Sequence, residues 1–176
     1  MRIEITDTTL RDGEQTQGVS YTPPEKLHIA ALLLKDVKVD HLEVASARVS
    51  GGEFEATRKI TDWARQNDLL SKIEVLGFVD GGLSLTWINN AGCKVINLLC
   101  KGSLRHLRKQ LRKTPEEHVS DIREIINEAE NLDMQVNIYL EDWSNGMINS
   151  EDYVYFMTDS LKDLRINRLM LPDTLG

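Results

Sequence analysis

The sequence predicts an α/β fold built on a parallel sheet. Short apolar runs typical of strands alternate with longer segments in which apolar residues recur at helical spacing. The strand-like runs recur about every 30 to 40 residues, which leaves room for a helix between successive strands. This alternation implies right-handed crossovers in an open doubly wound sheet or a closed barrel. No Gly-x-Gly-x-x-Gly follows the first strand, which disfavours a dinucleotide-binding sheet.

Six segments have the composition of strands. In chain order they are Ile3–Ile5, Asp40–Ala45, Ile73–Phe78, Lys94–Cys100, Gln135–Leu140 and Arg168–Leu171. Asp80, Gly81 and Gly82 form a turn signal after the third. We therefore expect six β/α units.

Two helix starts carry the same capping signal. Thr22 and Thr114 are each followed by proline and, three residues on, by Glu25 or Glu117, which is the pattern of a capping box. Apolar residues at helical spacing follow each start, namely Leu27, Ala30, Ala31 and Leu34 after the first and Val119, Ile122, Ile125 and Ile126 after the second. A further helix is expected through Phe54, Ile60 and Trp63.

Composition and charge exclude several classes of partner. The 176 residues are 41% hydrophobic and 28% charged, which is typical of one globular domain with a sizeable core. A net charge of -7 argues against nucleic-acid and anionic-membrane partners. No apolar run approaches the roughly 18 residues of a membrane helix, and no secretory signal is visible. Cys93 and Cys100 form no disulfide framework, so a cytoplasmic location is expected.

The chain is expected to be an incomplete domain. A closed eight-unit barrel needs about 200 residues or more, and six units would leave two strand edges unpaired, which favours aggregation. The sixth strand is followed only by Pro172–Gly176. We therefore interpret the chain as a fragment of a longer protein.

Residues with chemical potential follow the strands, at the ends where parallel α/β folds collect their sites. The segment Thr8–Gln15 holds an arginine, two carboxylates and an amide around Gly13. An aspartate there can bind a hard divalent cation, and an arginine can grip a carboxylate with two hydrogen bonds. The alternative is a polar turn with a surface pair between Arg11 and Glu14.

Two glutamates stand out in or after strands. Glu43 lies within an apolar strand, where burial is costly unless the carboxylate is paired. The alternative is that Glu43 points outward to solvent. Glu141 follows the fifth strand, where a carboxylate in a cleft can transfer protons.

The run Asp7–Gln15, DTTLRDGEQ, resembles the signature of the barrels that include 2-isopropylmalate, citramalate and homocitrate synthases. Hydroxymethylglutaryl-CoA lyase and the carboxylase domain of pyruvate carboxylase are more distant relatives. The resemblance implies that residues 1–176 are the N-terminal part of a single catalytic TIM (β/α)8 barrel. The chain would have about the first six units and lack strands seven and eight. It also implies that Asp12 binds a divalent cation (Mg, Mn or Zn), that catalytic Arg11 steadies the enolate or keto-acid oxygen, and that Gln15 contacts the 2-oxo acid.

The resemblance implies roles for residues on later strands. Glu43 would face the site with Arg11 as its partner, Glu141 would lie close to the reacting thioester, and Thr174 would hydrogen-bond the substrate. Two positions depart from the family pattern, because Asn97 stands where a histidine is frequent and Tyr139 where a serine is frequent. Asn97 is expected to replace the histidine as a neutral substrate contact.

The family's His-x-His pair on strand seven supplies two metal ligands, and the sequence contains no such pair. The four histidines are scattered, at His28, His41, His106 and His118. One carboxylate alone would not hold a catalytic cation tightly.

Basic residues gather after the fourth strand. Lys101 is expected to meet a substrate carboxylate or a CoA phosphate. A basic helical stretch with Leu104, Leu107 and Leu111 on one stripe then follows, and its charged residues are Arg105, His106, Arg108, Lys109, Arg112 and Lys113. A solvated helix face is the favoured interpretation, and a surface for CoA phosphates or a partner is the alternative.

The resemblance implies an acyltransferase that condenses acetyl-CoA, as a substrate, with a 2-oxo acid by metal-dependent Claisen condensation and thioester hydrolysis. We favour 2-oxoisovalerate, which gives 2-isopropylmalate in leucine biosynthesis. The alternatives are a citramalate or homocitrate synthase, a lyase similar to HMG-CoA lyase, and an inactive barrel fragment that binds a partner or itself. The 176 residues alone are expected to be inactive, and the full-length protein to be a homodimer.

Overall fold

A computed structural model of the chain describes residues 2–175, and it divides into two compact units. The first unit contains residues 1–77 and 84–96, and the second contains residues 78–83 and 97–176. Hydrogen-bonded neighbours in the six-stranded sheet follow the order β1-β2-β3-β4-β5-β6. Strand order equal to chain order is what successive β/α units of a barrel produce.

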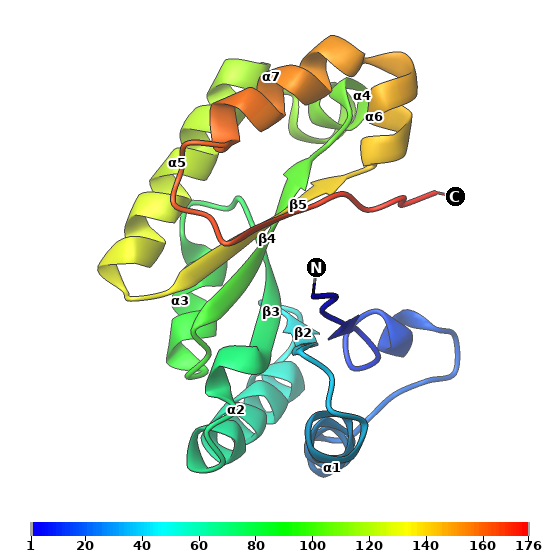
Figure 1. Cartoon of the computed structure of the whole chain (residues 1–176), viewed down its shortest axis with the longest axis vertical. Coiled ribbons are helices and arrows are strands. Elements are labelled where there is room, and N and C mark those ends of the chain that lie inside the picture. Colours follow the sequence, from blue (N-terminus) through cyan, green and yellow to red (C-terminus); the bar gives the residue numbers. More distant parts are fainter. Residues whose placement is uncertain (1, 176) are drawn as a thin grey trace. The chain divides into compact units, whose positions relative to one another are not determined.

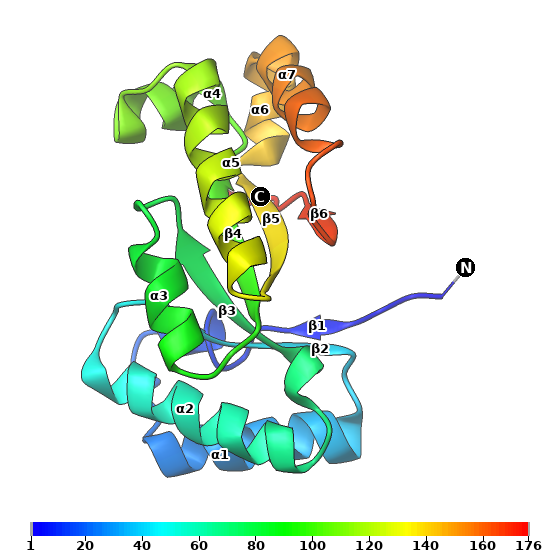
Figure 2. The ribbon, with the colours of Figure 1, turned by 90° about the vertical axis from the view of Figure 1, so that its left-hand side faces the viewer.

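The first unit contains β1 to β3 and the helices between them. Its elements are β1 (Thr6–Asp7), a 3-10 turn (Gly13–Gln15), α1 (Pro23–Leu32), a π-helical turn (Leu33–Val37), β2 (His41–Ser46), α2 (Gly51–Gln66), a second 3-10 turn (Leu70–Lys72), β3 (Ile73–Phe78, whose last residue is in the second unit) and α3 (Leu83–Asn90, whose first residue is in the second unit). Helix α1 packs against α2, and both contact β2 (Figure 2).

The core of the first unit lies between β2, β3 and the helices. Strand β2 pairs in parallel with both β1 and β3. Apolar side chains of these strands and of α2 and α3 are almost completely buried, among them Leu42, Val44, Ile60, Ile73, Val75, Leu85 and Ile88. Near-continuous burial along β2 and β3 is typical of a parallel sheet that is covered on both faces.

The second unit is built around β4, β5 and β6. Its elements are β4 (Val95–Lys101, whose first two residues belong to the first unit), α4 (Leu104–His106), a π-helical turn (Leu107–Leu111), α5 (Pro115–Asn131), β5 (Gln135–Glu141), α6 (Trp143–Asn149), α7 (Glu151–Leu161) and β6 (Arg168–Met170). Helix α5 packs against α7 and β5 (Figure 1). The buried apolar side chains include Leu98, Ile122, Ile138, Leu140, Met157 and Leu161.

Five of the six predicted strands are confirmed to within a residue at each end, and the first is displaced. The prediction of a strand at Ile3–Ile5 is wrong, because β1 is Thr6–Asp7 and the side chains of Ile3 and Ile5 are 77% and 61% exposed. The carbonyl of Ile5 does accept the N–H groups of Asp40 and His41, so the ladder begins where the strand was expected to end.

Both predicted capping boxes are present. Glu25 accepts a hydrogen bond from the backbone N–H of Thr22, and Glu117 does the same for Thr114. We predicted no helix between Trp143 and Leu161, and the structure has α6 and α7 there. Cys93 and Cys100 are buried and unbonded to each other, as expected, and burial raises the pKa of the Cys93 thiol to about 12. Within residues 2–175 no helix is both long and apolar enough to cross a bilayer.

Two glycines in the second unit allow close backbone contact. A Cβ atom at Gly146 in α6 would overlap the carbonyl of Gly102, and one at Gly102 would overlap the carbonyl of Leu140 in β5. The segment after β4 therefore lies against β5 and α6 at a distance that only glycine permits.

Gly146→Ala should lower the free energy of unfolding by about 2 to 3 kcal/mol, because the added methyl group has to displace backbone. Gly51→Ala is the matched control, since no atom lies within 4 Å of a Cβ built there at the start of α2. Urea unfolding of both variants measures the difference. Equal midpoints would contradict the proposed close packing.

Candidate functional site

The loop after β1 is a tight turn that fixes its charged residues. The carbonyl of Thr8 accepts the N–H groups of Arg11, Asp12 and Gly13 at 3.1, 2.7 and 3.2 Å. Asp7 accepts the N–H of Thr9 at 2.9 Å, and a 3-10 turn follows at Gly13–Gln15. The backbone bonds hold Arg11 and Asp12 next to the end of β1.

Arg11 links this loop to β2. Its Nε lies 2.5 Å from Oε2 of Glu43, whose side chain is completely buried, and its Nη1 lies 2.7 Å from Oδ1 of Asp12. The predicted contact between Arg11 and Glu43 is thus present. The alternative in which Glu43 faces solvent is wrong, and so is the surface pair of Arg11 with Glu14, because Glu14 bonds Lys26 instead.

Gln15 shares a cavity with Arg11. The cavity has a volume of about 410 Å³ and lies within the first unit, and its lining includes Arg11, Glu14, Gln15, Tyr21, Val49 and Glu53. It therefore combines a guanidinium and an amide with carboxylates. Such a lining can bind a small polar anion if the carboxylates are neutralised.

The end of β4 in the second unit carries an ion pair. Lys101 Nζ bonds Oε2 of Glu141 at the end of β5, and the two side chains are 11% and 22% exposed. Both backbone groups of Lys101 bond side chains: its N–H donates to Nε2 of His118 at 3.1 Å, and its carbonyl accepts from the hydroxyl of Tyr153 at 2.7 Å. The pair is thus anchored by α5 and α7.

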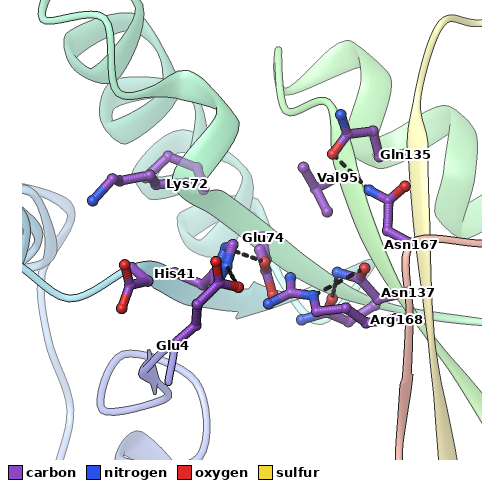
Figure 3. A network of polar contacts seen from close by, with 12 residues as sticks. Glu4, His41, Lys72, Glu74, Val95, Gln135, Asn137, Asn167 and Arg168 are labelled. Atoms are coloured by element: carbon purple, nitrogen blue, oxygen red, sulfur yellow. Dashed lines mark hydrogen bonds and ion pairs between the residues drawn. The ribbon is translucent and has the colours of Figure 1, made fainter. Parts of the chain in front are cut away.

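Asn97 lies deeper along the same strand. It is completely buried, and its Oδ1 accepts from Nδ2 of Asn137 at 2.8 Å. Arg168 Nε donates to Oδ1 of Asn137 at 3.3 Å, as Figure 3 shows. The structure gives Asn97 an internal partner, and its substrate contact stays a prediction.

The register of β4 and β5 stacks these pairs in layers. Asn97–Asn137 and Lys101–Glu141 have the same offset along the chain, and they lie four residues apart on each strand. Because strand side chains alternate between faces, both pairs lie on one face with Leu99 and Tyr139 between them. Met170 is the partner of Tyr139 in β6. The ion pair is therefore the outermost of three layers.

A second polar cluster lies on the first unit. Nδ1 of His41 is 3.0 Å from the buried Glu74, and its Nε2 is 3.2 Å from Glu4, as Figure 3 shows. His41 and Glu43 are two residues apart in β2, so their side chains lie on the same face of the strand. Glu43 is the register partner of Glu74 in β3. Buried carboxylates on this face thus have cationic or histidine neighbours.

Thr174 lies beside the β5 end within the second unit. Its hydroxyl accepts the backbone N–H of Asp142 at 2.8 Å, and Asp142 directly follows Glu141. Gly176, the last residue of the motif that contains Thr174, lies outside the described residues. Burial would raise the pKa of Asp142, but hydrogen bonds from Ser103 and Asn145 outweigh it and lower the pKa.

The basic segment is mainly a solvated face. Leu107 is completely buried, while Arg105, Arg108 and Lys109 are exposed. Arg105 and Arg108 also line a cavity of about 360 Å³ together with Asn145 and Asn149. The favoured interpretation is thus supported, and the phosphate surface stays an alternative.

The described residues do not form a complete metal site. Asp12 is 60% exposed and offers a carboxylate, but residues 2–175 contain no cluster of three or more His, Cys, Asp or Glu side chains able to hold a metal. Asp12 fits one ligand of a hard cation, and a single carboxylate binds such a cation weakly. The predicted site residues fall in both units: Arg11, Asp12, Gln15 and Glu43 in the first, and Asn97, Lys101, Glu141 and Thr174 in the second.

Three residues with clear structural roles could not be identified from the sequence pattern. Lys26 is buried beneath the loop, and His118 and Tyr153 hold the backbone of Lys101. His118 occupies the apolar face of a predicted helix, which signals burial, whereas Lys26 carries no such signal. Burial lowers the pKa of His118 to about 4, so the ring accepts from Lys101 as neutral imidazole.

Sheet order and strand-end residues define the class as an α/β barrel of the TIM type, of which the chain has about six β/α units. The chain belongs to the HMGL-like family, whose model matches residues 2–176. The chain is 34% identical over 175 residues to a putative (R)-citramalate synthase of Methanopyrus kandleri and 32% identical over 176 residues to a 2-isopropylmalate synthase of Saccharolobus solfataricus. These matches cover 99% of this chain but only 32% and 43% of those proteins.

Solved structures agree on the fold. An HMG-CoA lyase of Bacillus subtilis matches 99% of this chain and 59% of its own with a TM-score of 0.69 at 19% identity. An HMG-CoA lyase from Brucella melitensis has a TM-score of 0.68 at 19% identity and covers 99% of this chain and 62% of its own. The chain thus spans about a third to two fifths of these curated relatives and about three fifths of these solved ones.

Arg11→Met should lower the free energy of unfolding by about 3 kcal/mol, because Glu43 would lose the guanidinium that neutralises it in the interior. The double variant Arg11→Met/Glu43→Gln should recover most of this loss. Arg2→Met is the control, since Arg2 pairs with Asp40 while 76% exposed and should matter little. No recovery in the double variant would show that the pair is not what stabilises the loop.

Stability should fall in mild acid because of His118. Its pKa is about 4 in the folded chain against 6.5 for an ordinary histidine, so the unfolded chain binds the extra proton as pH falls through 6.5. The loss should reach about 2 kcal/mol between pH 7 and pH 5. Denaturant unfolding of His118→Gln should show a flatter pH dependence, whereas the exposed His28→Gln should keep the original slope.

Proposed function

We propose that the protein is an acyltransferase that condenses acetyl-CoA with a 2-oxo acid. The observation that carries the proposal is Arg11, held by buried Glu43 beside the exposed carboxylate of Asp12 at the end of β1. Membership of the HMGL-like family and the citramalate and 2-isopropylmalate synthases among the relatives support it.

Arg11 is proposed to stabilise negative charge on the keto-acid oxygen. Its contacts within residues 2–175 use Nε and Nη1, which leaves Nη2 able to donate to a substrate. Glu43 fixes the guanidinium plane, so the donor is oriented before the substrate arrives. Charge stabilisation by a preorganised donor is the usual way in which enzymes favour enolate and oxyanion states. Gln15 adds an amide on the same cavity.

Glu141 is proposed as the proton-transfer group near the thioester. Its carboxylate lies at the end of β5 and pairs with Lys101, and a carboxylate at such a position can transfer a proton. Lys101 in turn can meet a carboxylate of the substrate or a phosphate of CoA. Asn97 and Thr174 are proposed to complete the substrate contacts.

Asp12 is proposed to supply one ligand of a divalent cation, with the remaining ligands from further residues of a longer protein. Such a cation, when bound, would polarise the 2-oxo carbonyl. Because the chain spans about a third of its Methanopyrus kandleri relative, we propose that the active enzyme is longer and contains strands seven and eight. We also propose that it is a homodimer in the cytoplasm.

We favour 2-oxoisovalerate as the substrate and therefore 2-isopropylmalate as the product, in leucine biosynthesis. Support comes from the 2-isopropylmalate synthases of Saccharolobus solfataricus and Pyrococcus furiosus, 32% and 33% identical to this chain. A citramalate synthase is the main rival, since relatives with that name are equally similar. A homocitrate synthase, a lyase and a non-catalytic binding module are the other outcomes.

A panel of 2-oxoisovalerate, pyruvate and 2-oxoglutarate on the full-length protein should show CoA release with acetyl-CoA, fastest with 2-oxoisovalerate. Asp12→Asn should abolish this turnover, because the amide cannot replace a carboxylate ligand, while folding stays intact at an exposed position. Thiol release is followed with a chromogenic reagent. Preference for pyruvate would identify a citramalate synthase, and no release with any 2-oxo acid would reject the condensation.

A further inference from the structure

Lys26 in α1 is almost completely buried, with 1% of its side chain exposed. A lysine ammonium in the interior is costly unless charged and polar groups surround it. Its Nζ lies 2.5 Å from Oε2 of Glu14 and 2.6 Å from Oε1 of Glu53. The carbonyl oxygens of Leu10 and Val44 lie at 3.0 and 3.5 Å. One cation therefore serves four acceptors.

These acceptors come from three separate segments that surround Arg11. Leu10 precedes Arg11 and Glu14 follows Asp12, so the ammonium holds the loop on both sides of its charged residues. Val44 is the neighbour of Glu43 in β2. The other carboxylate oxygen of Glu14 accepts the N–H of Tyr21 at 2.9 Å. This bond joins the two ends of the segment between Glu14 and the start of α1.

Lys26 also sets the charge of the cavity that Arg11 and Gln15 share. Glu14 and Glu53 both line this cavity, and both carboxylates bond Lys26. Burial raises the pKa of Glu53, while the hydrogen bond and charge of Lys26 act against that shift. Without the ammonium, two carboxylates would face the cavity against one guanidinium. An anionic ligand would then be repelled rather than attracted.

We propose that Lys26 is a positioning residue for the anion site of Arg11 and Gln15: it fixes the loop Thr8–Tyr21 and neutralises the two carboxylates of the cavity. The identity of the anion as a 2-oxo acid rests on the proposed function. The role of Lys26 in fixing the loop does not rest on the proposed function, because it follows from contacts within the first unit alone.

The test compares Lys26→Met with Lys59→Met in the full-length protein. Lys59 also pairs with a glutamate on α2, Glu55, but it does so on the surface, so its loss should leave activity unchanged. Lys26→Met should speed hydrogen–deuterium exchange in residues 8–21 and lower kcat/KM for the 2-oxo acid about 10- to 100-fold, as loss of a group that orients a site residue typically does.

A third variant, Lys26→Met/Glu14→Gln/Glu53→Gln, separates positioning from simple stability. It removes the uncompensated carboxylates, so its melting temperature should return towards that of the parent even if Lys26→Met folds poorly. The loop would still lack its ammonium, so fast exchange in residues 8–21 and a raised KM for the 2-oxo acid should persist, with the KM for acetyl-CoA changed less.

Return of both the exchange rate and the KM to parent values in this triple variant would overturn the positioning role of Lys26, because the lysine would then act only by neutralising the two carboxylates. If the parent protein releases no CoA with any 2-oxo acid, the proposed function fails, and exchange in residues 8–21 alone decides the role of Lys26. Unchanged exchange in both Lys26 variants would reject that role.

Discussion

Glu43 is completely buried within β2, and a carboxylate in that place needs a cation within reach. Arg11 provides a cation from the loop after β1, and their ion pair ties the loop to the strand. The same pair orients the guanidinium that we propose as the anion-binding group. Arg11 and Glu43 therefore both neutralise a buried carboxylate and hold the proposed anion-binding guanidinium in one orientation. Lys26 follows the same principle, because its buried ammonium pairs with Glu14 and Glu53.

Helix and strand positions could be predicted well because their signals are local. Proline after threonine with glutamate at the third position was enough for α1 and α5, and apolar runs were enough for β2 to β6. The two-residue strand β1 was misplaced because Ile3 and Ile5 are apolar yet exposed. The bounds of so short a strand are set by its hydrogen bonds to β2, which the apolar pattern does not show. Serine, asparagine and glycine interrupt the apolar spacing of α6, which explains why that helix was missed. Helix α7 was missed although its buried residues Tyr153, Val154, Met157 and Leu161 recur at helical spacing.

The candidate site was predictable only in part. The cost of burying Glu43 indicated that its carboxylate needs a partner, and the family resemblance implied that the partner is Arg11. The pairing of Lys101 with Glu141 joins residues on neighbouring strands, and it depends on a register that neither segment encodes alone. Lys26 could not be predicted for a different reason. A lysine on a helix is ordinarily solvated, and Lys26 is buried only because the loop after β1 and α2 pack over it.

The layered register of β4, β5 and β6 separates what holds the interior from what does chemistry. Asn97, Asn137 and Arg168 form the lower layer by hydrogen bonds, and Lys101 with Glu141 forms the upper one. The side chains between these two layers are Leu99, Tyr139 and Met170, and all three are partly buried. Substitutions at these three middle positions would change the side-chain volume between the two polar layers while leaving the residues of both layers in place.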